Sequence, residues 1–246
     1  QQVDLQDRWT RQPCKGPARQ SDQNQRRQSV RASWAMTVLL VDYGMGNLFS
    51  VKRACGHAGL NAVITADKST IMNSYGVILP GVGAFGDAMD SLERKDLISP
   101  IKDFVQMGKP LMAICLGMQL LMSESEEFGL HKGLNIIEGS VIRFPAQNMD
   151  GGKIKVPQVG WNRIFQSSSE DWTYWNESPL KNIKSGEFMY FVHSYYTIPS
   201  DKKTILSTTT YEGIQFCSSI RKRNVFACQY HPEKSAAEGI KIYKNW

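Results

Sequence analysis

Histidine and cysteine are scarce in this sequence, and neither residue is spaced to bind a metal. Only 4 His occur among 246 residues, and the 5 Cys are scattered, without a Cys-x-x-Cys pair or the Cys/His spacing of a zinc site. We therefore expect no metal and no cofactor. An odd number of scattered cysteines also argues against a disulfide framework, which favours a reducing compartment and a cytoplasmic protein.

Long apolar runs are absent as well. No stretch approaches the roughly 20 residues of a membrane-spanning helix, and the N-terminus has no apolar core of a secretory signal. The chain has no internal repeat, no phosphate-binding Gly-x-x-x-x-Gly-Lys-Ser/Thr loop and no array of basic and aromatic residues. These absences predict a protein that binds neither a membrane nor a nucleic acid.

The formal net charge of +6 is concentrated at the N-terminus. Residues 1–35 hold seven of the 29 Lys and Arg and three of the 23 Asp and Glu, which leaves the remainder with a net charge of +2. This segment is rich in Gln, Arg and Ser and has no apolar periodicity, which predicts a disordered leader or a non-native extension. We expect the start at Met36 and one domain over 36–246. Residues 236–246 read as a helix without a stop signal, which indicates a truncated end.

Alternating strand and helix patterns predict an α/β fold. From Leu134 onward, strand patterns dominate. We expect a three-layer fold with a mostly parallel central sheet, helices on both faces and antiparallel strand additions, in which ligands bind at the carboxyl ends of the parallel strands. The predicted strands are 37–42, 62–65, 77–79, 111–114, 136–144, 159–165, 188–198, 204–210, 215–220 and 225–230, and the predicted helices are 47–58, 87–94, 98–107 and 116–122.

Cys115 lies where a predicted strand meets a predicted helix. Residues 111–114 form a short apolar run, and 116–122 are rich in good helix formers. A nucleophile on such a turn is the nucleophile-elbow arrangement, here with Gly117 after the turn. Alternatively, Cys115 is a small buried core residue, as most free cysteines are, and Ala113 stands where elbows often carry glycine.

His231 is the strongest candidate for a base. Pro232 biases His231 toward extended backbone, and residues two apart on an extended segment face the same way, so Glu233 can lie beside the imidazole and orient it. The alternative is ordinary capping chemistry, since Pro and Glu are common in the first turn of a helix. Together, Cys115, His231 and Glu233 are the minimum set for covalent acyl transfer.

These motifs resemble those of the class I glutamine amidotransferases, whose triad is Cys, His and Glu. Cys-Leu-Gly-Met-Gln at 115–119 and His-Pro-Glu-Lys-Ser at 231–235 carry the resemblance. Four further stretches occur in the order of one subfamily, the glutaminase subunits of imidazole glycerol phosphate synthase, at 41–47, 80–85, 159–162 and 190–196. The resemblance implies that L-glutamine is hydrolysed to glutamate and ammonia through a glutamyl thioester.

The resemblance also implies roles for residues outside the triad. It places the oxyanion hole at the backbone of Val82 and Leu116, substrate contacts at Gly81, Gln119, His193, Ser194 and Tyr195, and the partner interface at Asn47, Gln158 and Trp161. Two of these have plainer interpretations. The loop 81–83 is also typical of a simple strand-to-helix turn, and a hydrogen-bonded strand histidine is favoured over a catalytic part for the His193 side chain.

The partner that the resemblance implies is a separate (β/α)8-barrel cyclase, bound as a heterodimer. That cyclase makes imidazole glycerol phosphate and aminoimidazole carboxamide ribotide in histidine biosynthesis. Gln158 stands where the family usually has a histidine, so the alternative is a paralogue that feeds ammonia to another synthase, such as one that amidinates a surface-polysaccharide sugar. A third interpretation is a non-catalytic regulatory subunit, against which the intact Cys115, His231 and Glu233 argue.

Overall fold

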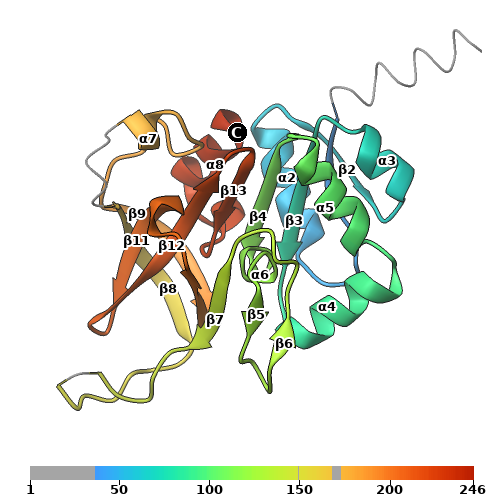
Figure 1. Cartoon of the computed structure of the whole chain (residues 1–246). Coiled ribbons are helices and arrows are strands. Elements are labelled where there is room, and N and C mark those ends of the chain that lie inside the picture. Colours follow the sequence, from blue (N-terminus) through green and yellow to red (C-terminus); the bar gives the residue numbers. More distant parts are fainter. Residues whose placement is uncertain (1–36, 149, 168–172) are drawn as a thin grey trace, which may run out of the picture.

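The computed structural model describes residues 37–148, 150–167 and 173–246. The predictions made for residues 1–35 and for Met36 fall outside these ranges. Within them, the strands and helices form one mixed sheet and its covering layers (Figure 1).

A parallel block forms one half of the sheet. Its strands run in the order β2-β1-β3-β4-β13, and every neighbouring pair in this block is parallel. Their carboxyl ends therefore lie at the same edge. The bounds are β1 (Thr37–Val41), β2 (Asn61–Thr65), β3 (Gly76–Gly81), β4 (Leu111–Cys115) and β13 (Val225–Cys228).

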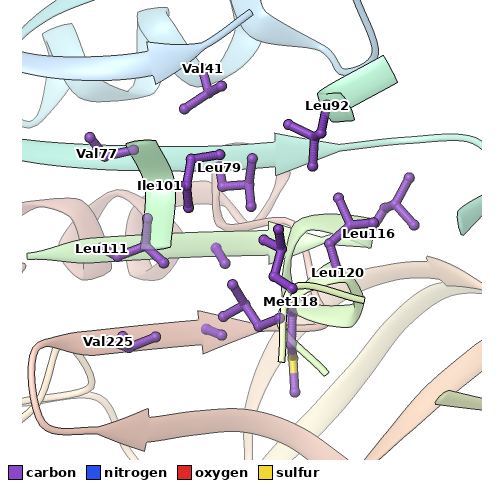
Figure 2. Packing of buried hydrophobic residues seen from close by; sticks show 14 of the residues in the cluster. Val41, Val77, Leu79, Leu92, Ile101, Leu111, Leu116, Met118, Leu120 and Val225 are labelled. Atoms are coloured by element: carbon purple, nitrogen blue, oxygen red, sulfur yellow. The ribbon is translucent and has the colours of Figure 1, made fainter. Parts of the chain in front are cut away.

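The parallel strands are apolar on both faces because helices cover both. In β1, Leu39 and Val41 belong to one buried cluster, whereas Val38 and Leu40 belong to the other. Figure 2 shows the first cluster, where Val41, Val77, Leu79 and Leu111 of the strands meet Leu92 and Ile101 of the helices. Burial on both faces explains why these strands read as continuous apolar runs.

The helices divide between the two faces. Residues of α3, α4, α5 and α6 pack into the first cluster, and residues of α2 and α8 pack into the second. The bounds are α2 (Leu48–His57), α3 (Lys68–Asn73), α4 (Phe85–Arg94), α5 (Ile98–Gln106), α6 (Leu116–Leu120) and α8 (Ala236–Asn245).

Mostly antiparallel strands extend the sheet beyond β13. The order continues β12-β10-β7-β5-β6, β11 pairs with β12 and β8, and β9 pairs with β8 (Figure 1). This confirms the predicted fold class. The remaining bounds are β5 (Glu124–Ser125), β6 (His131–Lys132), β7 (Gly139–Arg143), β8 (Gln158–Gln166), β9 (Glu187–His193), β10 (Tyr195–Pro199), β11 (Ile205–Tyr211), β12 (Ile214–Lys222), α7 (Thr173–Asn176) and the 3-10 turns η1 (Lys202–Thr204) and η2 (Pro232–Lys234).

Several elements differ from the sequence-based prediction. The strand predicted over 188–198 is two strands, which break at Ser194 because β9 pairs with β8 while β10 pairs with β7 and β12. The helix predicted over 116–122 ends at Leu120. The short helix α3, which the side chain of Asp67 caps by accepting from the amide of Thr70, was not predicted.

Candidate active site

Cys115 is the last residue of β4, and α6 begins at the next residue. Its backbone has a positive φ of 54° with ψ −111°, a conformation that L-residues rarely adopt and that marks the nucleophile elbow. Gly117 makes the turn possible, because a Cβ atom there would lie 1.9 Å from the carbonyl oxygen of Leu79. The predicted elbow geometry is therefore present.

His231 reaches the same edge of the sheet from β13, which pairs with β4 in parallel. Its backbone is extended, with φ −103° and ψ 95°, and its amide donates to the carbonyl of Tyr190 at 2.9 Å. Ser235 braces the turn that follows. Its hydroxyl donates to the carbonyl of His231 at 2.7 Å and accepts from the amide of Tyr190 at 3.0 Å.

Glu233 lies beside His231, as the spacing predicts. Its Oε1 is 2.8 Å from Nδ1 of His231, and the two side chains are only 2% and 3% exposed. Because a carboxylate oxygen only accepts, Nδ1 carries the proton and Nε2 is left as the basic nitrogen. Nε2 is buried and has no hydrogen-bond partner in the described part of the chain.

The charges around His231 favour its protonated form. Burial acts to lower the pKa of His231, but the negative charges of Cys115 and Glu233 outweigh it and raise the pKa to about 10. The imidazole therefore binds a proton readily when the sulfur of Cys115 is ionised.

A cavity of about 450 Å³ opens above Cys115. Most of the residues predicted to contact substrate or oxyanion lie around it, and Gly81 pairs in register with Cys115 and directly precedes the lining residue Val82. The lining residues are Val82, Gly83, Cys115, Leu116, Gln119, Glu127, Pro157, Val192, His193, Ser194, Tyr195, His231 and Lys234. The volume suits a ligand the size of an amino acid.

Two glutamines connect the cavity wall to the sulfur. The amide nitrogen of Gln119 donates to the carbonyl of Tyr195 at 2.9 Å and to Oε1 of Gln229 at 3.1 Å. Gln229 in turn donates to the sulfur of Cys115 at 3.6 Å. Gln229 was not predicted from the sequence, although it lies two residues before His231, the spacing at which side chains of an extended chain face the same way.

Glu127 lines the cavity but was not predicted from the sequence. It follows the short strand β5 and accepts a hydrogen bond from the amide of Phe85, the first residue of α4, at 2.6 Å. Burial and the nearby Asp87 raise the pKa of Glu127, against the effects of the Phe85 amide and of His131. A carboxylate outside the triad thus lines the cavity.

The side chain of His193 is tied into the sheet. Its Nδ1 donates to the carbonyl of Tyr195 at 2.8 Å, and its Nε2 is buried without a partner in the described residues. Burial lowers the pKa of His193 to about 4, and the nearby charge of His231 adds to this effect. The imidazole is therefore neutral at neutral pH, in line with a structural histidine.

The three residues predicted at a partner interface differ in accessibility. Trp161 on β8 is 52% exposed, and Asn47 lies at the exposed start of α2, where its side chain accepts from the amide of Ser50. Gln158 is only 2% exposed, because it pairs in register with His193 on the inner side of β8. The placement of Gln158 at a partner interface stays a prediction, and the burial of its side chain limits a direct contact to its backbone.

The described ranges lack the features of a metal site and of a membrane-spanning helix. No group of three or more His, Cys, Asp or Glu there is arranged to hold a metal ion. None of the described helices is long and apolar enough to cross a membrane.

The family model "Glutamine amidotransferase class-I" matches residues 39–246. Solved structures show the same fold at low sequence identity. A structure titled "Crystal structure of glutamine amidotransferase" has a TM-score of 0.62 and 16% identity, over 85% of this chain and 95% of that chain. The "Structure of PurLQS from Thermotoga maritima" has a TM-score of 0.62 and 19% identity, over 85% and 96%.

Closer relatives are subunits of one synthase. The protein from Geobacter sulfurreducens named "Imidazole glycerol phosphate synthase subunit HisH" is 43% identical over 210 residues, which cover 85% of this chain and 97% of the relative. The protein of the same name from Syntrophotalea carbinolica is 44% identical over 211 residues, with 85% and 98% covered. The chain thus belongs to the class I glutamine amidotransferases and, among them, to the HisH family.

Proposed function

We propose that this chain hydrolyses L-glutamine and passes the ammonia to a partner synthase, with Cys115 as nucleophile, His231 as acid and base, and Glu233 as the group that orients His231. The observation that carries the proposal is the convergence of three elements at one cavity: a cysteine on a strained elbow, a buried histidine beside it, and a carboxylate bonded to the far nitrogen of that histidine. This is the arrangement that covalent acyl transfer requires.

The first half-reaction releases ammonia. The ionised sulfur of Cys115 attacks the side-chain carbonyl carbon of glutamine, and the carbonyl oxygen becomes an oxyanion. His231 then gives its Nε2 proton to the amide nitrogen, and the C–N bond breaks. Ammonia departs, and a glutamyl thioester remains on Cys115.

The second half-reaction restores the enzyme. Neutral His231 takes a proton from a water molecule, which attacks the thioester carbonyl. The C–S bond breaks, glutamate leaves, and the imidazolium stands again beside an ionised sulfur. The raised pKa of His231 suits this role, because the histidine must hold a proton whenever Cys115 is ionised.

Backbone amides of Leu116 and Val82 are our candidates for the oxyanion hole. Leu116 opens α6 directly after the nucleophile, and Val82 follows Gly81, which is in register with Cys115. A Cβ atom at Gly81 would lie 2.4 Å from the hydroxyl oxygen of Tyr43, so only glycine lets this loop pass so close. Each preorganised donor is typically worth about 3 kcal/mol in the transition state.

Charge and hydrogen-bonding groups of the cavity account for recognition of glutamine. Glu127 provides a negative charge for the α-ammonium group, and its position is held by the Phe85 amide. The Nε2 atom of Gln119 is already bonded to protein, so its Oε1 is the atom we assign to substrate. The backbone of residues 193–195 forms the opposite wall.

The proposed partner is the cyclase subunit of imidazole glycerol phosphate synthase, and the pathway is histidine biosynthesis. We propose a heterodimer with a (β/α)8-barrel in the cytoplasm. The surface we assign to docking lies on β8 and β9 beside the cavity mouth. It includes the exposed Val159 and Trp161, Tyr190 packed edge-on against Trp161, and Lys234 over the Tyr190 ring.

One observation keeps a second candidate open. The resemblance implies a histidine where this chain has Gln158, whose buried Oε1 has no hydrogen-bond partner in the described residues. A synthase other than the histidine-pathway cyclase, such as one that amidinates a surface-polysaccharide sugar, is therefore the alternative acceptor of ammonia.

A reconstitution experiment tests these proposals. The purified chain is titrated with the histidine-pathway cyclase from the same genome, with and without the ribotide substrate of the cyclase, and glutamate formation is measured. We expect low activity alone and strong stimulation by the loaded cyclase. Stimulation only by a sugar-modifying synthase would replace the pathway, and no glutamate formation with either partner would leave a regulatory subunit as the answer.

A further inference from the structure

Only one oxygen of the Glu233 carboxylate is used by His231. Oε1 accepts from Nδ1 of His231, whereas Oε2 is buried and has no hydrogen-bond partner within the described chain. A buried carboxylate oxygen without a donor is unusual, since nearly all buried polar atoms in folded proteins are paired. A neighbouring group that donates a hydrogen bond to Oε2 would satisfy this atom.

The helix α8 packs closely against the turn that carries Glu233. A Cβ atom at Gly239 would lie 2.0 Å from the carbonyl oxygen of Pro232, so α8 lies against η2 with no room for a side chain. Tyr243 is one helical turn further along and therefore projects from the same face of α8 as Gly239. It is fully buried, in the cluster that also holds Cys55 and Cys228.

The hydroxyl of Tyr243 is a second buried atom without a partner among the described residues. Burial raises the pKa of Tyr243 well above its usual value, and the charge of Glu233 is the next largest cause. Two further neutral groups that sense this charge are the thiols of Cys55 on α2 and Cys228 at the end of β13. Thiols are weak donors, and that of Cys228 already donates to the carbonyl of Tyr230.

A buried hydrogen-bond donor, the Tyr243 hydroxyl, and a buried acceptor, Oε2 of Glu233, thus lie on two elements that pack against each other. We propose that Tyr243 is a positioning residue: its hydroxyl donates to Oε2 of Glu233 and so fixes the carboxylate, and through it His231, for proton transfer. One hydrogen bond would satisfy both atoms at once. Tyr243 touches no substrate in this scheme, so it acts only on the rate of the chemical steps. The inference rests on the proposed glutaminase reaction.

The test is Tyr243→Phe in the complex with the partner synthase, because this change removes the hydroxyl and keeps the ring. We expect kcat for glutamine hydrolysis to fall about tenfold, as expected for loss of a hydrogen bond to a charged group, while KM stays within about twofold. Tyr230→Phe is the matched control. Its hydroxyl is equally buried and unpaired in the described residues, but its surroundings are Cys228, Ser219 and Cys217 rather than Glu233.

A double-mutant cycle separates positioning from a general loss of packing. If Tyr243 acts through Glu233, Tyr243→Phe lowers kcat far less in a Glu233→Gln background than in the wild type. A Tyr243→Phe enzyme with kcat within twofold of wild type overturns the inference, as does an equal loss in both backgrounds or in Tyr230→Phe. Failure of the proposed function looks different, because the wild-type complex itself then forms no glutamate.

Discussion

Nδ1 of His231 lies 2.8 Å from Oε1 of Glu233, and this contact decides how the imidazole can act. The carboxylate keeps the proton on Nδ1, so Nε2 is the nitrogen that exchanges protons with Cys115 and with the leaving amine. The same carboxylate stabilises the imidazolium. Orientation and charge stabilisation are separable contributions, and substitutions can distinguish them.

The first prediction compares the two residues. His231→Ala removes proton transfer and should lower kcat for glutamine hydrolysis by at least about 100-fold. Glu233→Gln preserves the shape of the side chain but removes its charge, so kcat should fall measurably but less than in His231→Ala. Steady-state kinetics of the complex measure both. A Glu233→Gln loss equal to that of His231→Ala, or no loss from either, contradicts the assigned roles.

A second prediction concerns the nucleophile. Cys115→Ala should abolish glutamine-dependent activity, because no other group can form the thioester, while synthase activity with added ammonium should survive. Cys217→Ala is the control, since Cys217 is also a buried free cysteine and donates to the carbonyl of Ser219 on β12. Glutamine hydrolysis that persists in Cys115→Ala would exclude the proposed mechanism.

The third prediction tests Glu127 as the site of the α-ammonium group. Glu127→Gln should raise KM for glutamine about 10- to 100-fold, the range expected for a hydrogen bond to a charged group, with a smaller effect on kcat. Glu126→Gln changes the neighbouring, exposed carboxylate and should leave KM unchanged. If both variants raise KM alike, loss of loop structure rather than of the charge explains the effect.

Local patterns predicted the triad and the family resemblance predicted much of the cavity lining, but neither pointed to every residue around the site. A strand, a turn and a helix in sequence place Cys115, and the two-residue spacing of His231 and Glu233 brings them together on an extended segment. Glu127 and Tyr243 carry no such signal, because their relation to the site depends on how the segment after β5 and the helix α8 pack. The break at Ser194 has the same origin, since strand partners rather than local propensity end β9.

The fourth prediction concerns the pH dependence of stability. Burial lowers the pKa of His193 to about 4 in the folded chain, below the 6.5 of an unperturbed histidine. The unfolded chain therefore binds the proton more readily, and the folded state loses stability as pH falls from about 6.5 toward 4. Urea unfolding at pH 7 and pH 4.5 measures the free energy of unfolding at both values. Its decrease between them should be about 2–3 kcal/mol smaller in His193→Gln than in the wild type.

Two comparisons keep the His193 measurement interpretable. Other groups also titrate in this range, so the quantity that matters is the difference in pH dependence between wild type and variant. His57→Gln, at an exposed position in the last turn of α2, controls for the His-to-Gln change itself. A wild type and a His193→Gln variant that lose equal stability would show that His193 is not held neutral by burial.

The fifth prediction concerns the docking surface on β8 and β9. Trp161 is 52% exposed and packs edge-on against Tyr190, whose ring also lies under Lys234 at the cavity mouth. A large aromatic side chain held this way is the kind of anchor that dominates protein interfaces, so Trp161→Ala should weaken binding of the synthase by about 2 kcal/mol, or roughly 30-fold in Kd. Because stimulation depends on docking, glutaminase activity should recover at saturating synthase.

Tyr75→Ala is the control, since Tyr75 is 56% exposed just before β3, away from the edge that carries Cys115. Isothermal titration calorimetry measures both variants, and an unchanged Kd for Trp161→Ala, or equal weakening by Tyr75→Ala, would move the docking surface elsewhere.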